Sequence, residues 1–155
     1  MPAEDRRLYL AYGSNLNVRQ MRFRCPDAAA VGTAELSGWR LMYKSGFSGS
    51  YLTIEREEGS TVPVGVWSVS AQDEKNLDRY EGCPALYYKT DLRVQMRELE
   101  SGRIRAAEAF VYIMHEDRGL GRPAESYVER CREGYRDFGF DTAILDEAYR
   151  YSCGE

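Results

Sequence analysis

The chain has 155 residues and a formal net charge of −4, and its Lys and Arg residues are scattered rather than clustered. It therefore lacks the basic patch expected of a protein that binds nucleic acid or an anionic membrane surface. No apolar run approaches the roughly 20 residues that a membrane-spanning helix needs, and residues 1–7 are polar, without the pattern of a secretory signal. The length predicts a single domain over residues 1–155 with a buried core.

The numbers and spacing of cysteines and tyrosines exclude further classes of protein. Four cysteines, none of them in a C-x-x-C pair, are spread along the chain: Cys25, Cys83, Cys131 and Cys153. This spacing favours neither a zinc site nor a dense disulfide framework, so reduced thiols in a cytoplasmic protein are expected. Twelve tyrosines exceed what a plain core needs. Because buried hydroxyls need hydrogen-bond partners, some of them are expected to line a polar pocket.

The first predicted element is a strand over residues 8–12, which carries apolar side chains on both pleat faces, as in the interior of a sheet. The Gly-Ser-Asn segment at 13–15 breaks this period, because Gly permits positive φ and because Ser and Asn bond to nearby backbone. A helix is predicted next, with Leu16, Met21 and Phe23 as buried positions.

The turn between this strand and this helix is a candidate binding element. It leaves backbone N–H groups without helical acceptors, and together with the helix dipole these groups form an anion site. The alternative is that Ser14 or Asn15 only caps the helix.

Short β-rich segments separated by Gly, Ser and charged residues follow. The predicted strands cover residues 28–36, 39–43, 51–55 and 62–69, joined by a turn at 37–38, a polar loop at 44–50 and a charged turn at 57–60. The last strand is β-branched and apolar on both faces, like a central strand of a sheet. The polar loop is expected to be a plain connection, with a mobile loop beside a pocket as the alternative.

A helix is predicted after this strand. Ser70 has the features of its N-cap, with an acid three residues later, and Gly82 is placed to end it. Leu77 and Tyr80 are expected to face inward.

The rest of the chain predicts a hairpin and two helices. Strands at 86–99 and 103–114 are joined by a tip that contains Gly. Ser126 begins a second capping-box pattern, and Gly139 ends that helix. Asp141 is expected to cap a last helix.

Glu81 is the candidate catalytic residue, because it stands where the helix ends, next to Gly82. A carboxylate there faces the negative end of the helix dipole, which raises its pKa. Burial beside Tyr80, Tyr87 or Tyr88 would act in the same direction. A general base that works near neutral pH needs such a pKa. The alternative is a solvated acid at a helix end.

Other polar residues carry weaker predictions. His115 is the only histidine and cannot form a multi-His metal site, so a solvent-facing place at a strand end is expected. Asp78 and Glu74 lie one turn apart and are expected on a solvated helix face. Four tyrosines are expected to line the pocket, with core packing as the alternative for each: Tyr12, Tyr88, Tyr112 and Tyr127.

Three segments resemble the γ-glutamylcyclotransferase-like (AIG2-like) family. The first is Tyr-Gly-Ser-Asn-Leu at 12–16, which follows an apolar strand and is specific by itself. The second is Gly-Val-Trp at 65–67 with the following helix and Glu81, which matches the family's catalytic glutamate. The third is Phe-Val-Tyr at 110–112 with residues 123–127, which is similar to the family's Tyr-containing strand and Pro-Ser-x-x-Tyr helix start, with the serine shifted next to the tyrosine.

The resemblance implies a fold and a reaction. The fold is α+β (mixed α/β), a curved mixed sheet that closes to a small β-barrel with helices outside. The reaction releases 5-oxoproline from γ-glutamyl amino acids or related γ-glutamyl amides: the substrate's own α-amine attacks the γ-carbonyl, and Glu81 acts as general acid and base. The implied substrate-binding residues are Tyr12, Gly13, Ser14, Asn15, Leu16, Tyr88, Tyr112 and Tyr127. No metal or cofactor is implied, the partner is the small-molecule substrate, and a homodimer stays open.

Two alternatives keep the fold and change the function. One is a γ-glutamylamine or γ-glutamyl-acyl cyclotransferase with a different leaving group. A basic residue near the pocket mouth, Arg79 or Arg122, would favour a leaving group with its own carboxylate. The other alternative is a non-catalytic domain that binds a small molecule or another protein.

Overall fold

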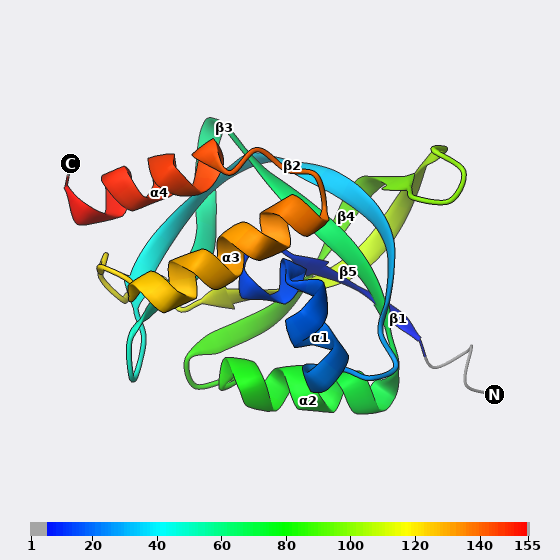
Figure 1. Ribbon diagram of the computed structural model, residues 1–155, viewed down its shortest axis with the longest axis horizontal. Coiled ribbons are helices and arrows are strands. Elements are labelled where there is room, and N and C mark those ends of the chain that lie inside the picture. Colours follow the sequence, from blue (N-terminus) through cyan, green and yellow to red (C-terminus); the bar gives the residue numbers. More distant parts are fainter. Residues whose placement is uncertain (1–5, 155) are drawn as a thin grey trace.

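Five strands close into a barrel in the computed structural model, which describes residues 6–154 (Figure 1). Met1–Asp5, part of the segment in which the sequence predicts no secretory signal, lie outside the described residues. The barrel order is β1-β3-β2-β4-β5, with β1 Arg7–Ala11, β2 Ala29–Ser45, β3 Ser50–Val69, β4 Tyr87–Glu98 and β5 Ile104–Met114. Because β1 pairs antiparallel with β3 and parallel with β5, the sheet is mixed. The predicted mixed barrel is confirmed.

Helices cover the outside of this barrel. Figure 1 shows α1 and α3 crossing the face toward the viewer, α2 below them and α4 above. Their bounds, with those of a short 3-10 helix η2, are η2 Ser14–Leu16, α1 Val18–Arg24, α2 Ala71–Glu81, α3 Glu125–Asp137 and α4 Ala143–Cys153. Among the described residues, no helix is long and apolar enough to cross a membrane. The four cysteines are free thiols.

The predicted turns at 37–38 and 57–60 do not exist as turns. Ser37 pairs with Thr61 and Trp39 with Arg56, so residues 57–60 of β3 stand opposite Gly38 alone. This is a large bulge within one long β2–β3 hairpin, and Gly38 supports it at a φ of 85°. The charged residues are tolerated because a bulge bends the strand without ending its pairing.

The first helix also differs from its prediction. Its N-cap is Asn17, whose side chain accepts a hydrogen bond from the Gln20 N–H, so neither Ser14 nor Asn15 caps α1. Instead, those two residues form η2, which is buried. The prediction for Phe23 was wrong, because its side chain is 82% exposed.

The central helix agrees with its prediction. Ser70 and Asp73 form the capping box of α2, and Gly82 ends it in the left-handed conformation. Leu77 is fully buried, whereas the Tyr80 ring, predicted to face inward, is 42% exposed. The helix therefore delivers its last residue to a defined position at the end of the barrel.

The two C-terminal helices begin differently from the prediction. Ala124 rather than Ser126 is the N-cap of α3, and no side chain caps it. Thr142 is the N-cap of α4, although the Asp141 carboxylate accepts a hydrogen bond from the Ala143 N–H. The start of α3 therefore lacks a side-chain cap, whereas Asp141 contributes one hydrogen bond at the start of α4.

Gly134 lies where α3 presses on the backbone after η2. A Cβ atom at Gly134 would stand 2.6 Å from the Asn17 nitrogen and 2.7 Å from the Leu16 carbonyl carbon. Alanine is otherwise the better helix former, by about 1 kcal/mol. We expect Gly134→Ala to lower the free energy of unfolding by about 1–3 kcal/mol, because backbone atoms cannot yield to the new methyl group. Denaturant unfolding measures this change.

The matched control is Gly119→Ala, since an added Cβ there meets nothing within 4 Å. This variant is expected to stay within about 0.5 kcal/mol of the parent. Equal unfolding midpoints for Gly134→Ala and the parent would contradict the close approach of α3.

Candidate active site

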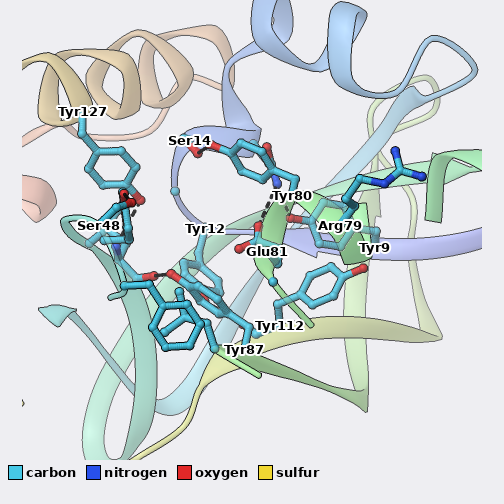
Figure 2. Close-up of a pocket in the computed structure, with 17 residues that line it drawn as sticks. Tyr9, Tyr12, Ser14, Ser48, Arg79, Tyr80, Glu81, Tyr87, Tyr112 and Tyr127 are labelled. Atoms are coloured by element: carbon cyan, nitrogen blue, oxygen red, sulfur yellow. Dashed lines mark hydrogen bonds between the residues drawn. The ribbon is translucent and has the colours of Figure 1, made fainter. Parts of the chain in front are cut away.

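A cavity of about 260 Å³ opens at one end of the barrel, where β1, η2 and the end of α2 meet (Figure 2). Tyrosine is the most frequent residue in its wall. The lining residues are Tyr9, Tyr12, Gly13, Ser14, Asn15, Phe47, Ser48, Tyr51, Leu52, Arg79, Tyr80, Glu81, Gly82, Leu86, Tyr87, Tyr112 and Tyr127. The cavity thus combines an apolar wall with a small number of polar groups, as ligand sites do.

Glu81 is the acidic residue of this wall, and Figure 2 shows it among the tyrosines. As the last residue of α2, it is held by the capping Gly82. Its Oε2 accepts a hydrogen bond of 3.2 Å from Asn15 Nδ2. Burial raises the pKa of Glu81 to about 7, against the opposing effects of the Arg24 charge and the Asn15 hydrogen bond. At neutral pH the group therefore both holds and releases a proton.

The tyrosine hydroxyls around Glu81 have fixed partners. Tyr9 Oη accepts a 2.8 Å hydrogen bond from Asn15 Nδ2, and Tyr12 Oη donates to the Tyr112 carbonyl at 2.6 Å. Burial, more than any other cause, raises the pKa of Tyr9, Tyr12, and Tyr112. These phenols consequently stay neutral, and Glu81 is the member of this group that titrates near pH 7.

The Gly-Ser-Asn turn is anchored from beneath by Trp67, whose Nε1 donates to the Asn15 carbonyl at 2.9 Å. Its glycine was predicted for positive φ, yet Gly13 has a φ of −134°. Close packing is the reason for this glycine: a Cβ would lie 3.2 Å from Leu52 Cδ1 and 3.4 Å from Tyr127 Oη. The N–H groups of Ser14 and Asn15, which open η2, have no backbone acceptor within the described chain.

The structure brings most of the predicted site residues together. Those that line the cavity with Glu81 are Tyr12, Gly13, Ser14, Asn15, Tyr112 and Tyr127. Leu16 and Tyr88 lie outside the lining: Leu16 is fully buried in the core, and Tyr88 Oη donates to Glu116 at 2.5 Å. His115 lies 5.2 Å from the Tyr88 ring, also away from the cavity.

Several lining residues were not singled out from the sequence. On β4, Tyr87 rather than Tyr88 points inward, and its hydroxyl donates to the Leu52 carbonyl at 2.8 Å. Neighbouring strand residues face opposite sides, so a tyrosine pair gives no signal of which one is inside. The loop expected to be a plain connection contributes Phe47 and Ser48 to the lining.

Arg79 and Arg122, the two basic residues considered for the pocket mouth, occupy different places. Arg79 lines the cavity and is exposed, and Figure 2 shows its guanidinium extending away from Glu81. Arg122 donates to Tyr149 Oη at 2.7 Å and does not line the cavity.

The helix face carrying Asp78 and Glu74 is not simply solvated. Lys89 Nζ contacts Glu74 at 2.6 Å and Asp78 at 2.9 Å, and Tyr112 Oη donates to Asp78 at 2.6 Å. This cluster ties α2 to β4 and β5 and thereby fixes the end of the helix that bears Glu81. Within residues 6–154, no three His, Cys, Asp or Glu side chains form a group that could hold a metal ion.

Comparisons with known proteins give one consistent family. The family model "Gamma-glutamyl cyclotransferase, AIG2-like" matches residues 9–130. A gamma-glutamylcyclotransferase of Homo sapiens is 30% identical over 105 residues, which cover 63% of this chain and 56% of that protein. The Mus musculus protein of the same name is 29% identical over 99 residues, 59% of this chain and 53% of that protein. The chain thus spans about half the length of these curated relatives.

Solved structures share the fold. A gamma-glutamyl cyclotransferase structure superposes with a TM-score of 0.76 at 22% identity, covering 92% of this chain and 86% of that one. YkqA from Bacillus subtilis gives a TM-score of 0.73 at 18% identity, covering 97% of this chain and 55% of that one. The family model includes the Gly-Ser-Asn turn and Glu81 within its matched range. The chain therefore belongs to the gamma-glutamyl cyclotransferase, AIG2-like family.

Proposed function

We propose that the protein is a γ-glutamylcyclotransferase, which converts a γ-glutamyl amide into 5-oxoproline and a free amine or amino acid. The observation that carries this proposal is Glu81: a half-buried residue whose carboxyl has a pKa of about 7, in the wall of a cavity that a small substrate could fill. A carboxyl of that pKa can take a proton and return it at neutral pH, as this reaction requires.

The reaction needs one acid–base group and no external nucleophile. Ionised Glu81 removes a proton from the substrate's α-ammonium group, and the free amine attacks the γ-carbonyl carbon to form the ring C–N bond. The resulting tetrahedral intermediate collapses when the protonated Glu81 donates to the leaving nitrogen and the original amide C–N bond breaks, and the ring nitrogen gives up its second proton to the released amine or to water. The cavity contributes by holding the substrate chain folded, because proximity makes an internal attack efficient.

The turn at residues 13–15 supplies donors for the negative charge that develops on the carbonyl oxygen. The N–H groups of Ser14 and Asn15 lack backbone acceptors and belong to residues that line the cavity. Preorganised backbone donors of this kind stabilise an oxyanion more than they stabilise the ground state. We assign them to the oxyanion or to the substrate's carboxylate.

Arg79 favours a leaving group that carries a carboxylate, and hence γ-glutamyl amino acids over γ-glutamyl amines. It lines the cavity, is exposed, and makes no ion pair with any described residue. Its long side chain can reach a carboxylate at the cavity entrance while Glu81 acts deeper in the wall. The proposal includes a small-molecule γ-glutamyl substrate as partner, a cytoplasmic location and no cofactor, and it leaves a homodimer open.

Glu81→Gln is the direct test of the mechanism. Glutamine keeps the size and the contact with Asn15 but cannot accept a proton, so we expect turnover to fall at least about 100-fold. The measurement is release of 5-oxoproline from γ-glutamyl dipeptides, γ-glutamyl amines and glutathione. The matched control is Glu147→Gln on α4, an exposed acid outside the cavity, which should retain full activity.

Activity of Glu81→Gln equal to that of the parent would remove Glu81 from the mechanism. A parent that binds γ-glutamyl ligands but releases no product across the whole panel would contradict enzymatic function and indicate a binding domain.

The pH dependence follows from the raised pKa of Glu81. The ionised form is the base, so kcat/KM should rise as pH passes through about 7. An ordinary carboxylate would be fully ionised above about pH 5 and would give a flat profile there. Steady-state rates between pH 5 and 9 distinguish the two. The substrate's α-amine also titrates, so a second substrate serves as the control. A γ-glutamyl compound with a lower amine pKa should leave the rise of kcat/KM near pH 7 unchanged, because that rise belongs to Glu81.

Arg79→Met tests the leaving-group assignment. An exposed ion pair between Arg79 and the substrate carboxylate contributes about 1 kcal/mol to binding. Its loss should raise KM about fivefold for γ-glutamyl amino acids. The KM for γ-glutamyl amines, which lack that carboxylate, should stay the same and serves as the internal control. Equal changes for both substrate classes would contradict a role for Arg79 in carboxylate recognition.

A further inference from the structure

Arg24, the last residue of α1, lies behind the cavity wall rather than in it. Its Nη1 donates to Asn15 Oδ1, and its Nη2 donates to Gln20 Oε1 at 3.2 Å. Its guanidinium carbon stands 3.5 Å from the centre of the Tyr80 ring. The side chain is thus held from two sides, with Asn15 as its link to the cavity.

Asn15 can serve Glu81 in only one of its two amide orientations. Its Nδ2 donates to Tyr9 Oη at 2.8 Å and to Glu81 Oε2 at 3.2 Å. A flipped amide would fit the same space but would place the oxygen against the Glu81 carboxylate, acceptor against acceptor. Tyr9 does not decide between the two, because a phenol can donate or accept.

The group that decides is Arg24. A guanidinium has donors and no acceptor, so it can face the Asn15 oxygen but not the Asn15 NH₂ group. When Oδ1 is held by Arg24, Nδ2 must point to Glu81. Backbone contacts hold the arrangement as well: the Arg24 carbonyl accepts from Asn76 Nδ2 at 3.0 Å, which joins α1 to α2.

We propose that Arg24 is a positioning residue for the general base, which orients the Asn15 amide so that it donates to the ionised form of Glu81. This inference rests on the proposed function, and it adds to it a residue that touches neither the cavity nor the substrate. Arg24 acts on the reaction through Asn15 and through its charge.

No second charged side chain among the described residues acts on the pKa of Glu81 as Arg24 does. Among the described residues it is the one whose charge lowers the pKa of Glu81, against the burial that raises it. The other titratable side chains that interact with Glu81 are neutral at pH 7 because burial raises the pKa of each: Tyr9, Tyr12, Cys83, Tyr87 and Tyr112. Removing Arg24 therefore removes the charge that lowers the pKa of Glu81. The Asn15 hydrogen bond is then the remaining group that opposes the effect of burial, and the Asn15 amide is free to flip.

The experiment compares the Glu81 carboxyl in the unliganded parent and in Arg24→Met, by NMR titration of the carboxyl carbon. Methionine keeps an unbranched chain beside Tyr80 but removes both charge and donors. We expect the pKa of Glu81 to rise by about one pH unit. The acid limb of the rate profile should move by the same amount, with kcat at pH 7 falling about fivefold and KM changing much less.

Three further variants sharpen the comparison. Arg22→Met, an exposed arginine on the same helix, should leave the Glu81 pKa and the rate profile unchanged. Arg24→Lys keeps the charge and one donor and should restore most of the parent's pKa. Arg24→Leu also loses the charge and every donor, so it decides the question if Arg24→Met does not fold.

A folded Arg24→Met or Arg24→Leu with the parent's Glu81 pKa would overturn the proposal. A loss in Arg24→Lys as large as in Arg24→Met would also overturn it, since that result indicates packing rather than charge and donor. The pKa is read without substrate, so it remains decisive even if the parent shows no turnover. In that case the proposed function fails, while the role of Arg24 toward Glu81 is still tested.

Discussion

The site depends on one carboxyl group, that of Glu81, being largely surrounded by protein. Burial disfavours its ionised form and raises its pKa to about 7 from the ordinary 4.5. The same shift makes stability depend on pH. Because the folded protein binds this proton more tightly than the unfolded chain does, protonation stabilises the fold fully below about pH 4.5, and this contribution is lost as pH rises through about 7. The barrel must therefore supply enough stability to keep an unfavourable group in place.

The architecture around Glu81 explains how that is achieved. Helix α2 is fixed at its start by the Ser70 capping box and at its end by Gly82, and the Lys89 cluster ties it to the barrel. Beside Glu81, the Asn15 carbonyl accepts a hydrogen bond from Trp67 of β3. The acid and its amide partner thus come from separate elements, each anchored on the same barrel. The fold itself therefore fixes the hydrogen bond between Asn15 and Glu81.

Local signals predicted well wherever a single segment contains all the interacting groups. The capping box at Ser70, the stop at Gly82 and the β4–β5 hairpin need only neighbours in sequence, and the structure confirms them. The turns predicted at 37–38 and 57–60 were wrong, because strand pairing continues beyond them. Gly38 and residues 57–60 form a bulge, which uses the same residue types as a turn. The capping-box pattern at Ser126 is an exception among the local signals, because the N-cap of α3 is Ala124 and no side chain caps it.

The sequence by itself determined the strand–turn–helix start, the capped α2 that ends at Glu81, and the family resemblance carried by residues 12–16. Only the tertiary structure decided that Tyr87 rather than Tyr88 faces the cavity, since strand pairing chooses which pleat face lies inside. It also decided that Arg24 reaches Asn15 and that burial gives Glu81 its pKa. The physical reason is that burial and charge act through space, between groups that the barrel brings together from distant parts of the chain.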